Sequence, residues 1–103
     1  MSKYRIIDIW NQIYGDKEEV YDYAGRLIKK CACNNPNSRF QPTIDHIRPL
    51  SKVGQDALNN IIICNRITNF EKNDKFSTWN TNGKVFQAHR VKGRSNKYCI
   101  VKI

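Results

Sequence analysis

The chain has 103 residues, of which 40% are hydrophobic and 11% aromatic. This length and composition predict one small folded domain and exclude a disordered tail and a multidomain enzyme. Its 18 lysine and arginine residues outnumber its 9 acidic residues, which gives a net charge of +9. No apolar run approaches the roughly 20 residues that a membrane-spanning helix requires, so a helical membrane protein is also excluded.

The first part of the chain predicts a helix, a hairpin and a loop. Over residues 4–14, apolar residues recur at intervals of three and four, as they do on one face of a helix, and Ser2 is placed to cap it. Residues 19–30 predict a β-hairpin with its turn at residues 23–25. Residues 31–42 are rich in asparagine, serine and proline, which predicts a loop.

The middle of the chain predicts two strands and a second helix. Residues 43–47 and 60–64 have the composition of short strands, and residues 48–59 between them predict a loop. Asn65 can cap a helix that we expect to continue to about Trp79. The expected order is therefore strand, loop, strand, helix.

The last part of the chain predicts a basic hairpin. Asn82-Gly83 is a strong two-residue turn signal, and residues 84–91 and 97–103 predict strands joined by a turn at 92–96. After Asp74 the sequence contains no acidic residue and seven lysines and arginines. Such asymmetry is typical of a surface that binds a polyanion, most often nucleic acid. The alternative is a solvated basic surface that keeps the protein in solution.

Three polar residues in the middle region have the chemistry of phosphodiester hydrolysis. The carboxylate of Asp45 and the amide of Asn69 offer hard oxygen ligands that suit Mg²⁺. A divalent cation offsets the charge that develops on the leaving oxygen, and the neutral imidazole of His46 can take a proton from water. Because successive strand residues point to opposite faces, a kink or the following loop must bring Asp45 and His46 to one site.

This region resembles the HNH endonucleases, also called the ββα-metal or His-Me finger nucleases. The resemblance rests on Asp-His-Ile-Arg-Pro at residues 45–49, the loop Ser-Lys-Val-Gly at 51–54, and Asn60 and Asn69 at the family's spacing after the histidine. Val53 stands where the family's loop usually has the first of two glycines.

The specific match covers residues 45–75. A looser similarity to small bacterial and phage HNH proteins extends back to about residue 10, through Trp10 and residues 21–28 and 37–40. Residues 80–103 show no resemblance to the family.

The resemblance implies a role for each matching residue. His46 would be the general base that activates water, and Asp45 and Asn69 would bind a divalent metal ion, Mg²⁺ or alternatively Mn²⁺. Asn60 would belong to the catalytic centre by holding the loop that orients His46. Many relatives bind structural zinc through two Cys-x-x-Cys pairs, but the cysteines of this chain do not have that spacing, so structural zinc is not expected.

The expected partner is nucleic acid, with DNA as the substrate, and no membrane or small-molecule cofactor is expected. The residues expected to contact nucleic acid are Lys52, Lys72, Lys75, Lys84, Arg90, Lys92 and Arg94. The sequence shows no signal-peptide core, so the cytoplasm of a bacterial or phage-infected cell is the expected location.

We therefore expect an α+β fold over residues 1–103 as one domain. Its ββα-metal core would span residues 43–79, preceded by a helix and a hairpin and followed by a basic C-terminal hairpin over 80–103. Two alternatives stay open: a non-catalytic module that binds nucleic acid through the same fold, and a secreted toxin nuclease, which the missing export signal disfavours.

Overall fold

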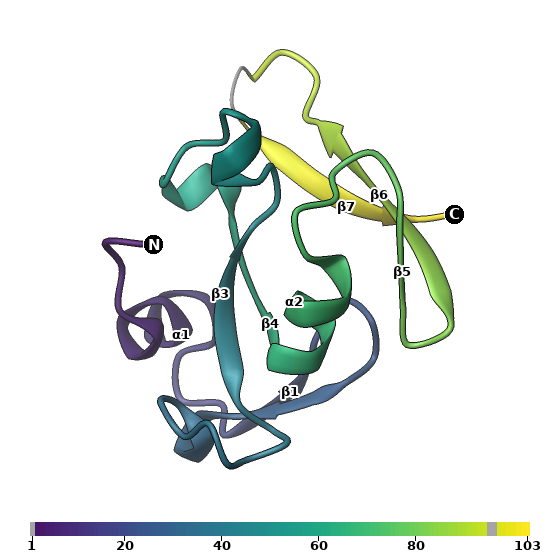
Figure 1. The fold of residues 1–103 in the computed structure, drawn as a ribbon. Helices are drawn as coiled ribbons and strands as arrows, with labels where there is room; N and C mark the ends of the chain where they lie inside the picture. Colours follow the sequence, from purple (N-terminus) through teal and green to yellow (C-terminus); the bar gives the residue numbers. More distant parts are fainter. Residues whose placement is uncertain (1, 95–96) are drawn as a thin grey trace.

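The computed structural model describes residues 2–94 and 97–103, so Ser95 and Asn96 of the expected turn at 92–96 lie outside the described residues. The fold is of the α+β class, as expected, with two α-helices and small antiparallel sheets (Figure 1). The helices and strands are α1 (Ile6–Tyr14), β1 (Glu19–Tyr21), β2 (Leu27–Lys29), β3 (Pro42–His46), β4 (Ile61–Asn65), α2 (Arg66–Lys72), β5 (Trp79–Thr81), β6 (Lys84–Arg90) and β7 (Tyr98–Lys102).

Helix α1 packs its apolar face against the β3–β4 pair. Ile9 and Trp10 are buried there together with Ile63 of β4, and Ile44 of β3 packs against the same cluster. The amphipathic pattern of the sequence thus predicts the helix correctly. The expected cap, Ser2, was wrong. The N-cap residue of α1 is Arg5, and the Ser2 hydroxyl donates a hydrogen bond to Asp56 instead.

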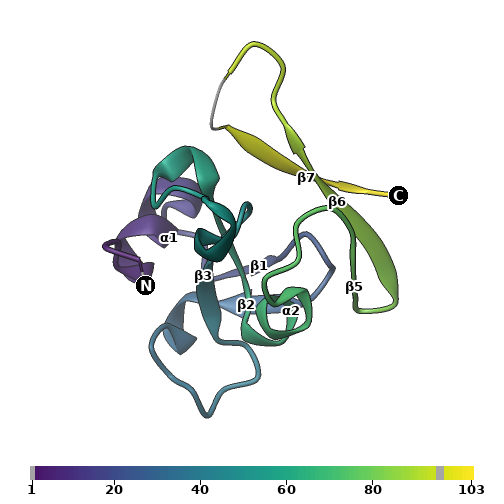
Figure 2. The same cartoon turned by 45° about the horizontal axis from the view of Figure 1, so that its top comes forward.

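Strands β3 and β4 pair antiparallel, and α2 follows β4 directly. Asp45 lies opposite Ile62 in this pair, and His46 lies opposite Ile61. Asn65 caps α2 as predicted, since its side chain accepts a hydrogen bond from the main-chain nitrogen of Ile67 at 2.9 Å. In Figures 1 and 2, α1 lies on one side of β3 and β4, and α2 lies on the other.

The second helix is shorter than expected. It ends at Lys72, because Asn73 adopts a left-handed φ of 53° and closes the last turn with a bond to the main-chain oxygen of Asn69. Trp79, the expected end of the helix, instead begins β5 and is buried against Phe86.

The C-terminal region is a three-stranded sheet rather than the expected hairpin. Strand β6 pairs with β7 on one side and with β5 on the other. Asn82 and Gly83 form the predicted two-residue turn between β5 and β6, with φ values of 52° and 73°. Strand β5 was missed because its three residues carry a single large apolar side chain, which is too weak a local signal.

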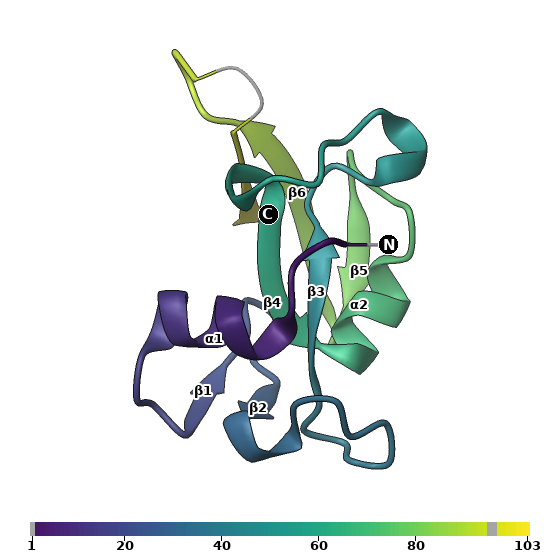
Figure 3. The ribbon, with the colours of Figure 1, turned by 90° about the vertical axis from the view of Figure 1, so that its left-hand side faces the viewer.

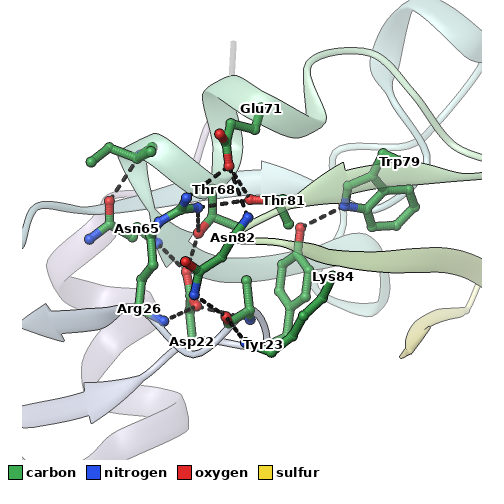
Figure 4. Close-up of polar contacts among 12 residues, drawn as sticks. Asp22, Tyr23, Arg26, Asn65, Thr68, Glu71, Trp79, Thr81, Asn82 and Lys84 are labelled. Atoms are coloured by element: carbon green, nitrogen blue, oxygen red, sulfur yellow. Dashed lines mark hydrogen bonds and ion pairs between the residues drawn. The ribbon is translucent and has the colours of Figure 1, made fainter. Parts of the chain in front are cut away.

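A partly buried polar network joins α2 to the β1–β2 hairpin and to β5 (Figure 4). The carboxylate of Asp22, which is buried, accepts a hydrogen bond from the Thr68 hydroxyl at 2.6 Å. The guanidinium of Arg26 donates to Thr68, to Thr81 at 2.8 Å and to Glu71 at 2.8 Å. These contacts hold α2 against the hairpin and β5. No helix in the described part of the chain is long and apolar enough to cross a bilayer.

Candidate active site

A cleft of about 520 Å³ lies between β3 and α2, and Pro49 and Leu50 from the segment after β3 also line it. It brings together three of the residues singled out in the sequence, namely Asp45, His46 and Asn69. His46 is the last residue of β3, where the chain leaves the strand. The cleft is lined by Thr43, Asp45, His46, Pro49, Leu50, Arg66, Asn69, Phe70, Asn73 and Asp74.

The carboxylate of Asp45 is buried and incompletely satisfied. Its Oδ2 atom has no hydrogen-bond partner, and the Nζ atom of Lys72 lies 3.4 Å from it. Burial raises the pKa of Asp45 above its ordinary value, and the Lys72 ammonium opposes that rise. Asp45 is thus an acidic group held in a position where an added cation would stabilise its charged form.

Lys72 is completely buried, which corrects the expectation that it contacts nucleic acid. Its ammonium donates a hydrogen bond to the main-chain oxygen of His46 at 3.0 Å and lies 5.2 Å from the centre of the Trp79 ring. Since Asn69 and Lys72 are three residues apart on α2, they share the helix face that packs on β3. Lys72 therefore joins the helix to the strand that carries Asp45 and His46.

The amide of Asn69 is oriented by β3. Its Nδ2 atom donates to the Thr43 hydroxyl at 3.1 Å and to the main-chain oxygen of Ile44 at 3.3 Å. Because a carbonyl oxygen only accepts hydrogen bonds, these contacts identify the nitrogen and leave Oδ1 as the available ligand atom. Within residues 2–94 and 97–103, no hydrogen bond engages that oxygen.

The loop after β3 is held by Asn60, which lies outside the cleft lining and is completely buried. The Asn60 side chain accepts from the main-chain nitrogen of Arg48 at 2.8 Å and donates to the main-chain oxygens of Arg48 and Gln55. Gly54 is required in this loop, because a Cβ atom there would lie 1.8 Å from the main-chain oxygen of Arg48. Asn60 thus acts on the loop and has no free polar atom for a substrate.

Val53, the departure from the family's two glycines, adopts a left-handed backbone conformation. Its φ is 66° and its ψ is 23°, values that favour glycine and that a β-branched residue rarely adopts. The side chain is 83% exposed, so packing does not compensate for the backbone strain. The loop therefore keeps a conformation suited to glycine although valine occupies the position.

His46 has a partner that sequence reasoning missed. Its Nε2 atom lies 2.8 Å from Oδ1 of Asp56, a residue of the loop between β3 and β4. Asp56 also accepts hydrogen bonds from the Ser2 hydroxyl and the main-chain nitrogen of Lys3, both at 2.7 Å. No spacing rule links these four positions, because their contacts depend on the path of the loop and of the N-terminal segment.

The other expected nucleic-acid contacts lie outside the cleft. Lys84 is half-buried, and its ammonium donates to the main-chain oxygen of Ala24 at 3.2 Å. Arg66, to which no sequence motif points, is the one lysine or arginine among the cleft-lining residues that the structure describes. The remaining expected contacts are all exposed, namely Lys52, Lys75, Arg90, Lys92 and Arg94.

The family model of the HNH endonucleases matches residues 23–78, which include β3, β4, α2 and the cleft between them. The chain therefore belongs to the HNH endonuclease family, and the family prediction is confirmed. No curated protein and no solved structure matches the chain. Membership of this family implies nuclease-type chemistry on nucleic acid at the level of the domain.

Proposed function

We propose that this protein is a metal-dependent endonuclease that hydrolyses phosphodiester bonds of DNA, and that β3, β4 and α2 are its ββα-metal core. The observation that carries the proposal is the common cleft of Asp45, His46 and Asn69, within the segment that matches the family. A carboxylate, an imidazole and an amide at one cleft are the groups that metal-assisted hydrolysis requires.

The donor set at the cleft fits a divalent cation with hard oxygen ligands. The carboxylate of Asp45 and Oδ1 of Asn69 would hold the ion, and Mg²⁺ commonly takes one or two protein ligands together with water and phosphate oxygens. The buried Oδ2 of Asp45 without a hydrogen-bond partner supports this fit. In the described residues, those of the cleft included, His, Cys, Asp and Glu side chains form no group of three that could hold a metal ion, so the proposed site has one carboxylate and one amide as its protein ligands. When bound, the ion would stabilise the charge on the leaving oxygen.

The chain's own residues supply the remaining chemistry. His46 takes a proton from a water molecule, and the water oxygen then forms a bond to phosphorus while the bond from phosphorus to the 3′ oxygen breaks. Lys72 fixes the main chain of His46, and Asn60 fixes the loop that follows it. The products have 5′-phosphate and 3′-hydroxyl ends, as the resemblance to the family implies.

Charge and exposed apolar surface support nucleic acid as the substrate. The net charge of +9 attracts a polyanion, and Arg66 lies in the cleft itself. Phe70, also in the cleft lining, is 83% exposed and offers an aromatic face on which a base can stack. The exposed residues of the C-terminal sheet region, Arg90, Lys92 and Arg94, would bind phosphates beyond the cleft. Action in the cytoplasm of a bacterial or phage-infected cell stays a prediction.

A substrate and metal panel tests the proposal. The purified protein is incubated with supercoiled plasmid, single-stranded DNA and RNA in the presence of Mg²⁺, Mn²⁺ or EDTA. We expect nicked or linear plasmid with either metal ion and no cleavage with EDTA. Salt-sensitive binding to DNA without cleavage under any of these conditions would reject the proposal and favour the non-catalytic binding module. Cleavage of RNA alone would retain the reaction and correct the substrate.

A further inference from the structure

We propose that Asp56 is a positioning residue that fixes the orientation and the tautomer of His46, and that the Ser2–Lys3 segment holds Asp56 in place. The inference rests on the proposed function, since it assigns a partner to the proposed general base. It makes the N-terminal segment, far from the family's motif in the sequence, a part of the site.

Three hydrogen bonds converge on one carboxylate. Oδ1 of Asp56 lies 2.8 Å from Nε2 of His46 and 2.7 Å from the Ser2 hydroxyl. Oδ2 accepts from the main-chain nitrogen of Lys3 at 2.7 Å. The His46 and Asp56 side chains are only 12% and 21% exposed, so solvent screens their contact less than that of a surface pair.

The carboxylate determines which nitrogen of His46 carries the proton. The three hydrogen bonds hold the pKa of Asp56 well below its ordinary value, so this group is ionised and can only accept hydrogen bonds. Nε2 must therefore be the N–H donor, and Nδ1 of the neutral ring is the nitrogen left to accept a proton. Among the described residues, no hydrogen bond to Nδ1 is formed.

This arrangement suits a base that receives a proton during the reaction. Nδ1 takes the proton from water as the water oxygen bonds to phosphorus, and the bond to the 3′ oxygen breaks with its electron pair on that oxygen. The ring becomes an imidazolium ion, and the adjacent Asp56 carboxylate stabilises its charge. Asp56 therefore acts through His46 and touches neither substrate nor leaving group.

The N-terminal segment is anchored well enough to hold this carboxylate. The segment leads directly into α1, whose Ile9 and Trp10 are buried against the β3–β4 pair. Figure 3 shows it rising from α1 and crossing in front of β3, below the loop between β3 and β4. The Ser2 hydroxyl also accepts from the main-chain nitrogen of Tyr4 at 3.1 Å, which orients its proton toward Asp56.

The test replaces Asp56 with asparagine, which keeps the shape of the side chain but adds N–H donors. The introduced amide can donate to Nε2, which moves the ring proton to Nδ1 and blocks the base. We expect Asp56→Asn to lower kcat by about 10- to 100-fold, as when the partner that orients a functional histidine is removed, with KM unchanged. Ser2→Ala should give a smaller loss of kcat, and Asp16→Asn, an exposed carboxylate in the turn after α1, should give none.

Nitrogen-15 NMR of the histidine rings supplies a readout that does not depend on cleavage. We expect the neutral His46 ring of the parent protein to carry its proton on Nε2, and that of Asp56→Asn to carry it on Nδ1. A parent protein that cleaves, together with an Asp56→Asn variant of unchanged or higher kcat, would overturn the inference and leave the proposed function intact. A parent ring protonated on Nδ1 would overturn it as well. A parent protein that cleaves nothing would reject the proposed function instead.

Discussion

The buried ammonium of Lys72 lies 3.4 Å from the Oδ2 atom of Asp45. The Lys72 side chain is completely inaccessible and that of Asp45 is 9% exposed, so neither charge is effectively solvated. The same ammonium bonds to the main-chain oxygen of His46 at 3.0 Å. One cation thus compensates the buried carboxylate and ties α2 to the end of β3, where the candidate base is found.

Lys72→Met tests this relationship by removing the charge while keeping much of the side-chain volume. The variant leaves the Asp45 carboxylate buried without its partner, so we expect the free energy of unfolding to fall by about 3–5 kcal/mol. Urea unfolding near neutral pH measures the change. Lys75→Met, at an exposed position three residues further along, is the matched control and should alter stability little. Equal stability of the two variants would show that the pair contributes nothing.

Val53→Gly should make the protein more stable, against the usual effect of introducing glycine. The left-handed conformation at Val53 costs a non-glycine residue about 1–2 kcal/mol, and glycine avoids this cost. Part of the gain is offset by the greater freedom of glycine in the unfolded chain, so we expect a net gain of about 0.5–1 kcal/mol. Thermal and urea unfolding measure the stability of Val53→Gly relative to the parent, and Ser51→Gly in the same loop is the control. A less stable Val53→Gly variant would contradict the loop conformation.

Glu71 gives the fold a pH dependence with a defined sign. The Thr81 hydroxyl, the Arg26 guanidinium and the main-chain nitrogen of Asn82 lower the pKa of Glu71 from 4.5 to about 2. The pKa of Glu71 is lower in the folded protein than in the unfolded chain. The ionised Glu71 carboxylate therefore stabilises the fold fully above pH 4.5, and this stabilisation is lost as the pH falls from 4.5 toward 2.

We therefore expect Glu71→Gln to be less stable than the parent at neutral pH and to lose less stability over that acidic range. Urea unfolding at a series of pH values measures both effects. Glu18→Gln is a suitable control because the Glu18 side chain is exposed and forms no hydrogen bond within the described residues. If Glu71→Gln and the parent lose stability in parallel below pH 4.5, the depressed pKa is wrong.

Features with local causes could be predicted from the sequence. The β1–β2 hairpin, the Asn65 cap and the Asn82–Gly83 turn each depend on a few neighbouring residues, and all three are confirmed. Strand composition and the Asn65 cap also placed Asp45 and His46 correctly on a strand and Asn69 on a helix.

Features that depend on distant contacts could not be predicted. Trp79 was expected at the end of a helix, but its burial against Phe86 in β6 places it in a strand. Lys72 was expected near phosphate because it follows the helical ligand as in members of the family, whereas Asp45 and the main chain of β3 compensate its charge inside the fold. The bond between Asp56 and His46 similarly depends on the three-dimensional path of a loop that has no regular period.

The most direct test of the central claim is the rate of plasmid nicking by His46→Ala, measured at saturating DNA with Mg²⁺. A general base contributes about 10²- to 10⁴-fold to the rate, so we expect this variant to lose cleavage while its fold and DNA affinity stay close to those of the parent. His89→Ala, which replaces the exposed histidine of β6, should cleave at the parent rate. If His46→Ala nicks plasmid as fast as the parent protein, His46 is not the base and the mechanism is wrong.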